Sequence, residues 1–449
     1  MAISSFSAPS LPEPNLIRIH VLESLSRYWA EDAIPIASLP IDILKTSPRI
    51  EPPLRLVSVA LPDWARKDGV NGEILIPTEA QGRLSFGGKT SWQNVDWFLA
   101  AFLLLECWHE RIWEYGHGPI HSYSFRLKEW DARAWSHAWV NRIALFLRCW
   151  AAHNQNTTPE ALFGPLPASN VLMTHDVDAV EKTLAIRLKQ SAFNAINALR
   201  LLARGKPKAS ICCVRQCLRL LFGKEDWWQF DLLLSAEAAA NIQSLFHFHA
   251  DLTPKTLKRW LFDPGYDIKQ PRIKTLFAEL HRRGHQIGLH PGFESWDDLT
   301  EVAEQKRNLE SISGGSINAC RQHWLRFSWQ ATWSSQEQGG LHSDTTLMFN
   351  DRPGFRNSSA LRWQPWNAKS NTQHQITAQP SVLMDSHLYD YQPFSDAERR
   401  SEMRYWLAEC QTIHGEAAVL WHPHTLTKDY GWESGFNELL TAIIQMRQV

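Results

Sequence analysis

The sequence predicts an α/β protein in which a distorted (β/α) barrel follows a smaller α/β domain. Strand-like apolar runs alternate with helical patterns through the second half of the 449-residue chain, as they do in folds built on a parallel sheet. A polar stretch containing Gly164, Pro165 and Pro167 separates this half from the first, and such stretches are typical of linkers. We therefore expect an N-terminal α/β domain of unknown role over residues 1–165 and the barrel over residues 166–449.

The composition is that of a soluble globular protein. It is 44% hydrophobic and 21% charged, and 46 basic residues balance 47 acidic ones, so no global charge favours nucleic acid as a partner. The first residues, MAISSFSAPSLPEPNL, have neither a basic start nor an apolar core, which predicts a cytoplasmic protein. Seven cysteines are an odd number and do not resemble a disulfide framework.

The first half mixes short strand-like runs with aromatic-rich helical stretches. LRLVSVAL, at 54–61, has the pattern of a strand, and residues 95–115 and 132–150 have that of helices. The most apolar run, from Trp97 to Trp108, contains Glu106 and is too short to cross a bilayer. We expect it to form a buried helix.

Strand and helix alternate regularly in the second half. Apolar residues at i, i+3, i+4 and i+7 predict a helix that is capped by Gly284 and followed by the strand QIGL; they are Ile273, Leu276, Phe277 and Leu280. Further strands are expected within 171–174, 244–250, 380–385 and 417–424. The capping box Ser395-x-x-Glu398 opens another helix.

Ionisable residues follow several of these strands. Asp176 and Asp178 follow VLMT, His290 follows QIGL, and His422 follows the last apolar strand. Barrel enzymes assemble their sites at the carboxyl ends of the strands, so we expect one catalytic site here. Residues i and i+2 of a strand face the same way about 6.5 to 7 Å apart. The two aspartates therefore need a cation between them, unless one is protonated.

Five motifs in this order, THDVD, GHQIGLHPGFES, RQHWLRF, DRPGFR and VLWHPH, resemble those of the polysaccharide deacetylases of carbohydrate esterase family 4. The similarity is to the subgroup with THDVD and IGLHP motifs, and it covers roughly residues 166–449. It implies a distorted (β/α) barrel that binds one divalent metal ion, with zinc expected, and hydrolyses the N-acetyl group of an amino sugar.

The resemblance also implies roles for individual residues. Asp176 would be the general base, and Asp178 and His290 would be metal ligands. Arg321 would orient the base or the substrate by a bidentate contact, and His422 would be the general acid. His424 lies in the same loop and could exchange roles with His422.

The sequence departs from the family pattern at the second motif. The second histidine of that motif is replaced by Glu294, which can bind a metal through oxygen, so the predicted ligands are Asp178, His290 and Glu294. Val177 separates two aspartates that are adjacent in the standard first motif, which leaves the roles of Asp176 and Asp178 exchangeable. The alternative is a relative without metal that binds a sugar or lipid and does not cleave it.

Three further residues are predicted to contact the substrate. His323 and Trp324 lie in the third motif, close to Arg321, and His323 could also orient a neighbour. Arg356 could meet an anionic part of the substrate, or it could form an ordinary ion pair. Asp385 could support His422.

Residues 182–224 form a basic insert. They contain ten basic residues and no acidic one: Lys182, Arg187, Lys189, Arg200, Arg204, Lys206, Lys208, Arg215, Arg219 and Lys224. Interleaved leucines and isoleucines predict an amphipathic helical hairpin that turns at RGKPKAS. It suits an anionic partner, either membrane headgroups or the diphosphate of a nucleotide- or polyprenyl-linked sugar. The alternative is a solvated basic face whose apolar side packs on the barrel.

The resemblance implies a deacetylase of surface-polysaccharide synthesis, and the start of the chain predicts that it is cytoplasmic, peripheral to the inner membrane if the insert binds lipid. A hydrolase of another linear amide is the alternative with the same metal ligands. The identity of the sugar and the oligomeric state are left open by the sequence.

Overall fold

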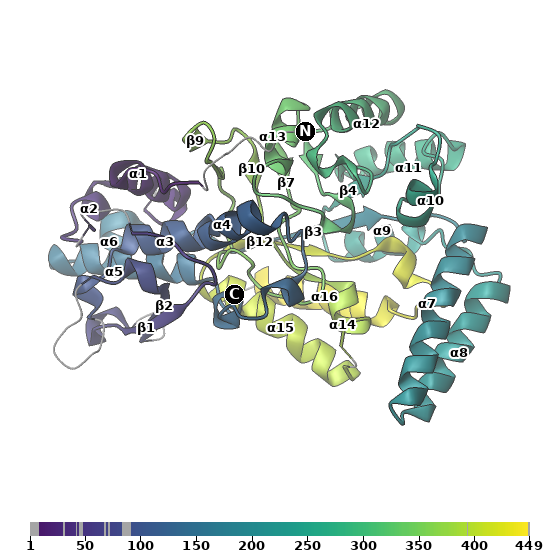
Figure 1. Cartoon of the computed structure of the whole chain (residues 1–449), viewed down its shortest axis with the longest axis horizontal. Helices are drawn as coiled ribbons and strands as arrows, with labels where there is room; N and C mark the ends of the chain where they lie inside the picture. Colours follow the sequence, from purple (N-terminus) through teal and green to yellow (C-terminus); the bar gives the residue numbers. More distant parts are fainter. Residues whose placement is uncertain are drawn as a thin grey trace.

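One eight-stranded parallel sheet forms the centre of the molecule (Figure 1). The computed structural model describes residues 9–447 except 30–31, 42, 45–47, 67–68, 71, 83–90 and 393. In hydrogen-bonding order the strands are β10 (Thr377–Ala378), β7 (Ser343–Asp344), β6 (Ala319–Cys320), β5 (Gln286–Leu289), β4 (Leu245–Phe248), β3 (Asn170–Val177), β12 (Glu416–Leu420) and β11 (Ser381–Met384).

The sheet is curled into a distorted barrel. β10 and β11 lie at its opposite edges, yet only Gln379 and Pro380 separate them in the chain, so the two edges must approach each other. Inside the curl, the guanidinium of Arg321 donates to Thr174 of β3 at 2.6 Å and to Ser381 of β11 at 2.8 Å. The predicted fold class is confirmed.

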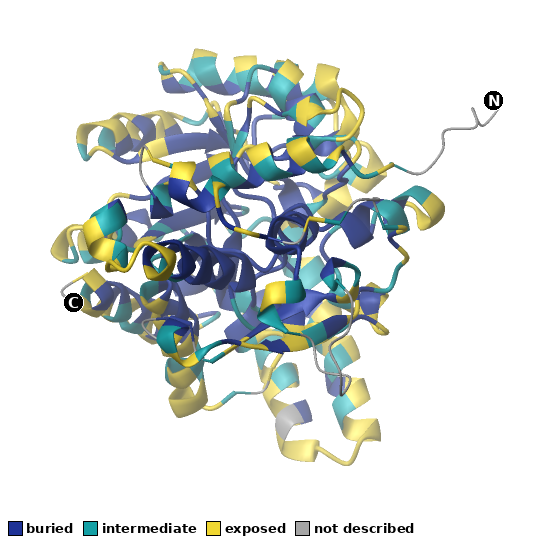
Figure 2. Cartoon of the chain, turned by 90° about the vertical axis from the view of Figure 1, so that its left-hand side faces the viewer, coloured by how far each residue is buried: buried dark blue, intermediate teal, exposed yellow. Residues whose placement is uncertain are grey.

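Helices cover the outside of the curled sheet (Figure 1). They are α9 (Phe230–Ala239), α10 (Leu257–Phe262), α11 (Pro271–Arg282), α12 (Leu299–Ser313), α13 (Thr332–Gln338), α14 (Asp385–Tyr389), α15 (Asp396–Thr412) and α16 (Glu433–Arg447). α11 buries the four predicted apolar residues, and Gly284 beyond its end has a φ of +77°. The predicted capping box at Ser395 opens α15. The strands lie in the buried interior, dark blue in Figure 2.

The first part of the chain packs against the barrel. It contains β1 (Leu56–Ala60) and β2 (Glu73–Pro77), which are antiparallel, and the helices α1 (Pro14–Ser24), α2 (Ile34–Ala37), α3 (Trp97–Leu105), α4 (Trp108–His117), α5 (Trp139–Asn154) and α6 (Pro159–Phe163). β8 (Trp366–Asn367) and β9 (Thr372–Gln373) form a further small hairpin. As expected, α3 is buried along its whole length.

A buried carboxylate links the two parts. Glu106, at the end of α3, accepts from Arg111 at 2.5 Å, from the Trp363 indole at 3.0 Å and from the Trp366 amide at 3.0 Å. Residues from both parts also contribute to one hydrophobic core. The domain boundary at residue 165 stays a prediction.

The basic insert forms the predicted hairpin. Its helices α7 (Leu184–Ala203) and α8 (Pro207–Phe222) pack against each other and extend from the body at the lower right of Figure 1. Among the described residues we find no helix with the length and apolar character that crossing a membrane requires.

Candidate metal centre and catalytic site

The ionisable residues predicted from the strand ends meet at one edge of the sheet. Asp176 is on β3 and Asp178 directly follows it, His290 follows β5, and His422 follows β12. All four line a cavity of about 660 Å³. They meet because parallel strands place their carboxyl ends at the same edge.

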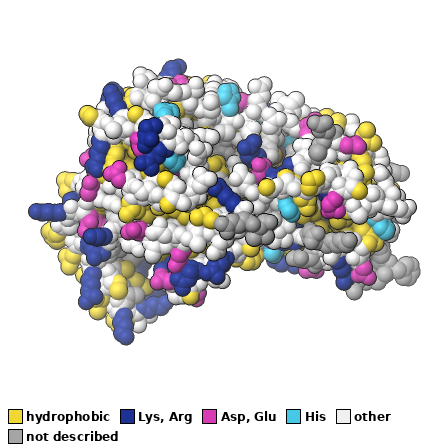
Figure 3. All heavy atoms as spheres, turned by 180° about the vertical axis from the view of Figure 1, so that it is seen from behind, with side chains coloured by type: hydrophobic (Ala, Val, Ile, Leu, Met, Phe, Trp, Pro, Cys, Tyr) yellow, Lys and Arg dark blue, Asp and Glu magenta, His cyan; other side chains and the backbone are white. Residues whose placement is uncertain are grey.

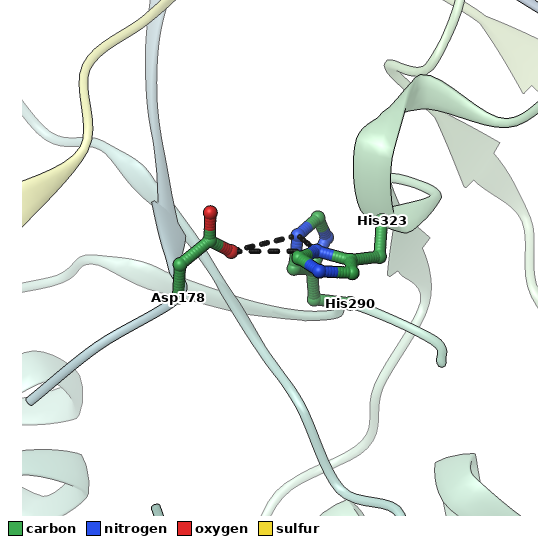
Figure 4. Close-up of side chains that lie close together, drawn as sticks. All are labelled: Asp178, His290 and His323. Carbon is green, nitrogen blue, oxygen red and sulfur yellow. Dashed lines mark hydrogen bonds and ion pairs between the residues drawn. The ribbon is translucent and has the colours of Figure 1, made fainter. Parts of the chain in front are cut away.

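Three side chains converge on one point (Figure 4). The Oδ1 atom of Asp178 lies 3.2 Å from Nε2 of His290 and 3.4 Å from Nδ1 of His323. The two histidine nitrogens are 2.9 Å apart. Their distances allow these three atoms to share a metal ion.

The hydrogen bonds of His290 and His323 show which of their ring nitrogens carry a proton and which carry a lone pair. His290 Nδ1 donates to the Arg321 carbonyl at 2.6 Å, and His323 Nε2 donates to the Phe262 carbonyl at 2.8 Å. Since a carbonyl can only accept, the inner nitrogens carry lone pairs when the rings are neutral. Three lone pairs then face one another, and a positive charge is needed between them.

The charges around this point agree with that requirement. Burial lowers the pKa of His323, but the Asp178 carboxylate outweighs it and raises this pKa above its usual value. Burial raises the pKa of Asp178, but His323 and His290 hold it well below the usual range. Two imidazoles and one carboxylate are a ligand set typical of zinc hydrolases, so these residues fit a divalent cation.

Glu294 does not belong to this cluster, contrary to the prediction. Its side chain is 45% exposed and forms an ion pair with Lys258 at the surface. His323 provides the third potential ligand in its place. The three-residue turn His323–Leu325 brings it there, with left-handed φ angles at Trp324 and Leu325.

Arg321 and His247 hold one carboxylate oxygen of Asp176 in place. Its Oδ1 atom lies 3.2 Å from Nη1 of Arg321 and 3.1 Å from Nδ1 of His247, while Oδ2 lies 3.9 Å from Nε2 of His290. Burial raises the pKa of Asp176, but Arg321, His290 and His247 lower it far more, so the carboxylate is ionised. Arg321 reaches it through one nitrogen and not through the expected bidentate contact.

His422 is paired with Asp385, the first residue of α14. Its Nδ1 donates to Asp385 Oδ1 at 2.8 Å, and Nε2 lies 3.6 Å from Asp178 Oδ2. Burial lowers the pKa of His422, but Asp385 and Asp178 raise it to about 10. His424 also lines the cavity, but burial and the charge of His422 lower its pKa to about 4. His422 is therefore the better proton donor of the two.

The residues predicted to bind substrate divide into two groups. Trp324 and His323 line the cavity, and Trp324 is 44% exposed. Arg356 is buried instead, where its Nη2 donates to Glu110 of α4 at 2.9 Å. This ion pair ties α4 to the barrel, so the structure agrees with the ion-pair alternative for Arg356 and does not place its side chain in the cavity.

Sequence reasoning missed the histidines of β4 and the segment after it. His247 contacts Asp176, and His249 forms a second group with Asp251 and Asp263 whose ligand atoms lie within 4.8 Å of one another. Asp251 is already paired with Arg259 at 3.1 Å. The alternating histidines of SLFHFHA were the signal available in the sequence.

No family model matches the sequence, and no curated protein matches it either. Among solved structures, a Mycobacterium smegmatis protein assigned as a polysaccharide deacetylase is 18% identical, with a TM-score of 0.35 over 62% of this chain and 88% of that one. The polysaccharide deacetylase Bc1974 from Bacillus cereus is 9% identical, with a TM-score of 0.28 over 62% and 87%. A family 4 pseudoenzyme from Bacillus anthracis is 12% identical, with a TM-score of 0.25 over 63% and 61%. Because these values are low, the function is inferred from the side chains of the site.

Proposed function

We propose that this chain is a metal-dependent hydrolase that removes the N-acetyl group from an amino sugar carried on a nucleotide or a lipid. The observation that carries the proposal is the convergence of the Asp178, His290 and His323 donor atoms beside a carboxylate and an imidazole. The resemblance of the five sequence motifs to family 4 deacetylases supports the same reaction.

The three donors would hold the cation, and we propose zinc. Bound there, a divalent ion supplies Lewis-acid polarisation of the acetamide carbonyl and of water.

Asp176 and His422 move the protons. Asp176 accepts a proton from the attacking water, whose oxygen bonds to the acetyl carbon. Arg321 and His247 fix Oδ1 of Asp176, and Oδ2 is the oxygen closer to His290. His422 gives its Nε2 proton to the amide nitrogen as the C–N bond breaks, and acetate and a free amine leave. Asp385 keeps His422 protonated and oriented.

The cavity supports a sugar with an anionic substituent. Its volume of about 660 Å³ is in the usual range for small-molecule sites, and Trp324 offers an aromatic face for a sugar ring. Lys189 and Arg200 of α7 also line it, and their charges suit phosphate. All seven cysteines are free, which fits the proposed cytoplasmic location.

Acetate release tests this function. The zinc-loaded protein is incubated with a panel of N-acetylated amino sugars and acetylated linear amines. We expect acetate from the sugars, and a loss of at least about 100-fold in Asp176→Asn and His422→Asn. Acetate from the amines alone would favour a hydrolase of another linear amide. Sugar binding without acetate release would favour a non-catalytic module.

A further inference from the structure

The α7–α8 hairpin is bound to the body of the protein at its base, and toward its turn its two helices contact each other. At the base, Lys182 Nζ lies 2.7 Å from Asp429 Oδ2, and Arg187 donates to the Leu221 and Gly223 carbonyls at 2.9 Å. Near the turn, Ser210 of α8 donates to the Ala198 carbonyl of α7 at 2.8 Å. The two helices therefore hold each other as they extend beyond the barrel (Figures 1 and 2).

Both helices expose large apolar side chains. On α8 they recur at i, i+3, i+7 and i+11, which is one face of the helix: Ile211, Val214, Leu218 and Phe222. On α7, Leu184, Leu188, Leu199 and Leu202 are exposed as well, Leu184 by 71%. So many exposed apolar side chains on one element mark an interaction surface.

The charge of the hairpin has one sign. Residues 182–224 contain ten basic residues and no acidic one, whereas the whole chain has a net charge of −1. Arg204, Lys206 and Lys208 are exposed around the turn. In Figure 3, dark blue and yellow spheres lie together on the protruding part at the lower left. The exposed apolar residues of the two helices thus stand among charged residues that are all basic. Such a surface is complementary to an anionic lipid leaflet, which offers both acyl chains and phosphate headgroups.

Another face of α7 belongs to the cavity. Ile186, Gln190, Phe193 and Asn197, at i, i+4, i+7 and i+11, line it together with Lys189 and Arg200. α10 lies beside α7, where Lys189 Nζ donates to the Trp260 and Leu261 carbonyls at 2.9 and 2.7 Å. Trp260 and Leu261 are themselves 39% and 40% exposed. α10 thus adds exposed apolar side chains beside this wall of the cavity.

We infer that the α7–α8 hairpin docks on an anionic membrane leaflet and thereby brings the cavity to a substrate anchored in that leaflet through a lipid phosphate. The substrate part of this inference rests on the proposed function and chooses the lipid-linked sugar over the nucleotide-linked one. The docking part rests on the hairpin alone.

Co-sedimentation with vesicles tests the docking. The probes are phosphatidylglycerol vesicles and phosphatidylcholine vesicles, used with the zinc-loaded full chain. We expect binding to the anionic vesicles that weakens with added salt. The variant Arg204→Glu/Lys206→Glu/Lys208→Glu should bind about 100-fold more weakly. The matched control Lys274→Glu/Arg362→Glu/Lys369→Glu reverses three charges that are exposed elsewhere and should bind like wild type.

Two results would overturn the inference. One is equal binding of wild type to both kinds of vesicle. The other is a concentration-dependent dimer that Leu199→Ser/Leu202→Ser disrupts, because a second copy would then cover the hairpin. Acetate release is measured on the same samples with two substrates, an N-acetylated sugar linked to a nucleotide diphosphate and one linked to a polyprenyl diphosphate in the vesicles. Vesicle binding without acetate release would contradict the proposed function alone, and acetate release without vesicle binding would contradict the docking alone.

Discussion

His290 Nε2 and His323 Nδ1 lie 2.9 Å apart, although each ring already donates its other nitrogen's proton to a main-chain carbonyl. Two bare lone pairs at this distance repel each other, and Asp178 adds a carboxylate oxygen at 3.2 and 3.4 Å. A proton or a cation between them removes the repulsion. A divalent cation bound by all three atoms would satisfy them together.

Arg321 is expected to position the base without touching substrate. Its guanidinium is fully buried and joins Asp176 to Thr174, Ser381 and the Thr345 carbonyl. Lysine keeps the charge but loses the fork of donors. Arg321→Lys should therefore lower kcat about 10 to 100-fold with little change in KM. A rise in KM at unchanged kcat, in steady-state acetate release, would place Arg321 at the substrate instead.

Asp385 is expected to support the proton donor. Asparagine can keep the shape of the contact with His422, but it removes the charge that holds the imidazole protonated. Asp385→Asn should lower kcat by about 100-fold or more. Asp396→Asn, at an exposed position on α15, serves as the matched control. Equal activity of the two variants would contradict a role for His422 as the acid.

Variants at Trp324 and Arg356 should have different effects, the first on substrate binding and the second on the stability of the fold. Trp324→Ala removes an exposed aromatic wall of the cavity, so KM should rise several-fold while the free energy of unfolding changes little. Arg356→Ala leaves the buried Glu110 carboxylate without its ion-pair partner, with the Trp329 indole as its remaining donor, so the free energy of unfolding should fall by about 3 kcal/mol. Denaturant unfolding and substrate titration measure both quantities, and the reverse pattern would restore Arg356 to the substrate site.

Glu106 should make the stability depend on pH. Burial raises its pKa, but His20 and Arg111 lower it below the usual value of 4.5. A carboxyl group with a lowered folded pKa stabilises the fold above its unfolded pKa and loses this contribution as the pH falls toward the folded value. Glu106→Gln should reduce the free energy of unfolding by about 3 kcal/mol at pH 7.

The difference between wild type and Glu106→Gln should then shrink below pH 4.5. Glu304→Gln, an exposed change on α12, should show no comparable effect. Urea titrations at a series of pH values measure this difference. A difference that stays constant down to pH 3 would contradict a lowered pKa at Glu106.

The sequence predicts those site residues whose position follows from the regular alternation of strands and helices. Apolar strands that end in Asp176, His290 and His422 belong to parallel neighbours, so their carboxyl ends had to meet at one edge. His323 lies in a turn in which the next two residues, Trp324 and Leu325, have left-handed φ angles. The pattern of side chains in the sequence does not predict this backbone conformation. The sequence does not show that Glu294 pairs with Lys258 or Arg356 with Glu110, because these partners come from other elements.

His247 was missed for a related reason. Every residue of β4 is buried, so the alternation that distinguishes a functional face from a core face is absent there. A buried histidine in such a strand has the same pattern as a core residue. Its contact with Asp176 becomes visible only when β3 and β4 are paired.

The metal content of purified wild type, His323→Ala and Glu294→Ala tests the central claim most directly. After loading with zinc and dialysis, elemental analysis should find about one equivalent in wild type and in Glu294→Ala. His323→Ala should retain far less while its circular dichroism stays that of the folded protein. Loss of zinc from Glu294→Ala, with retention in His323→Ala, would contradict the assignment of the metal to Asp178, His290 and His323.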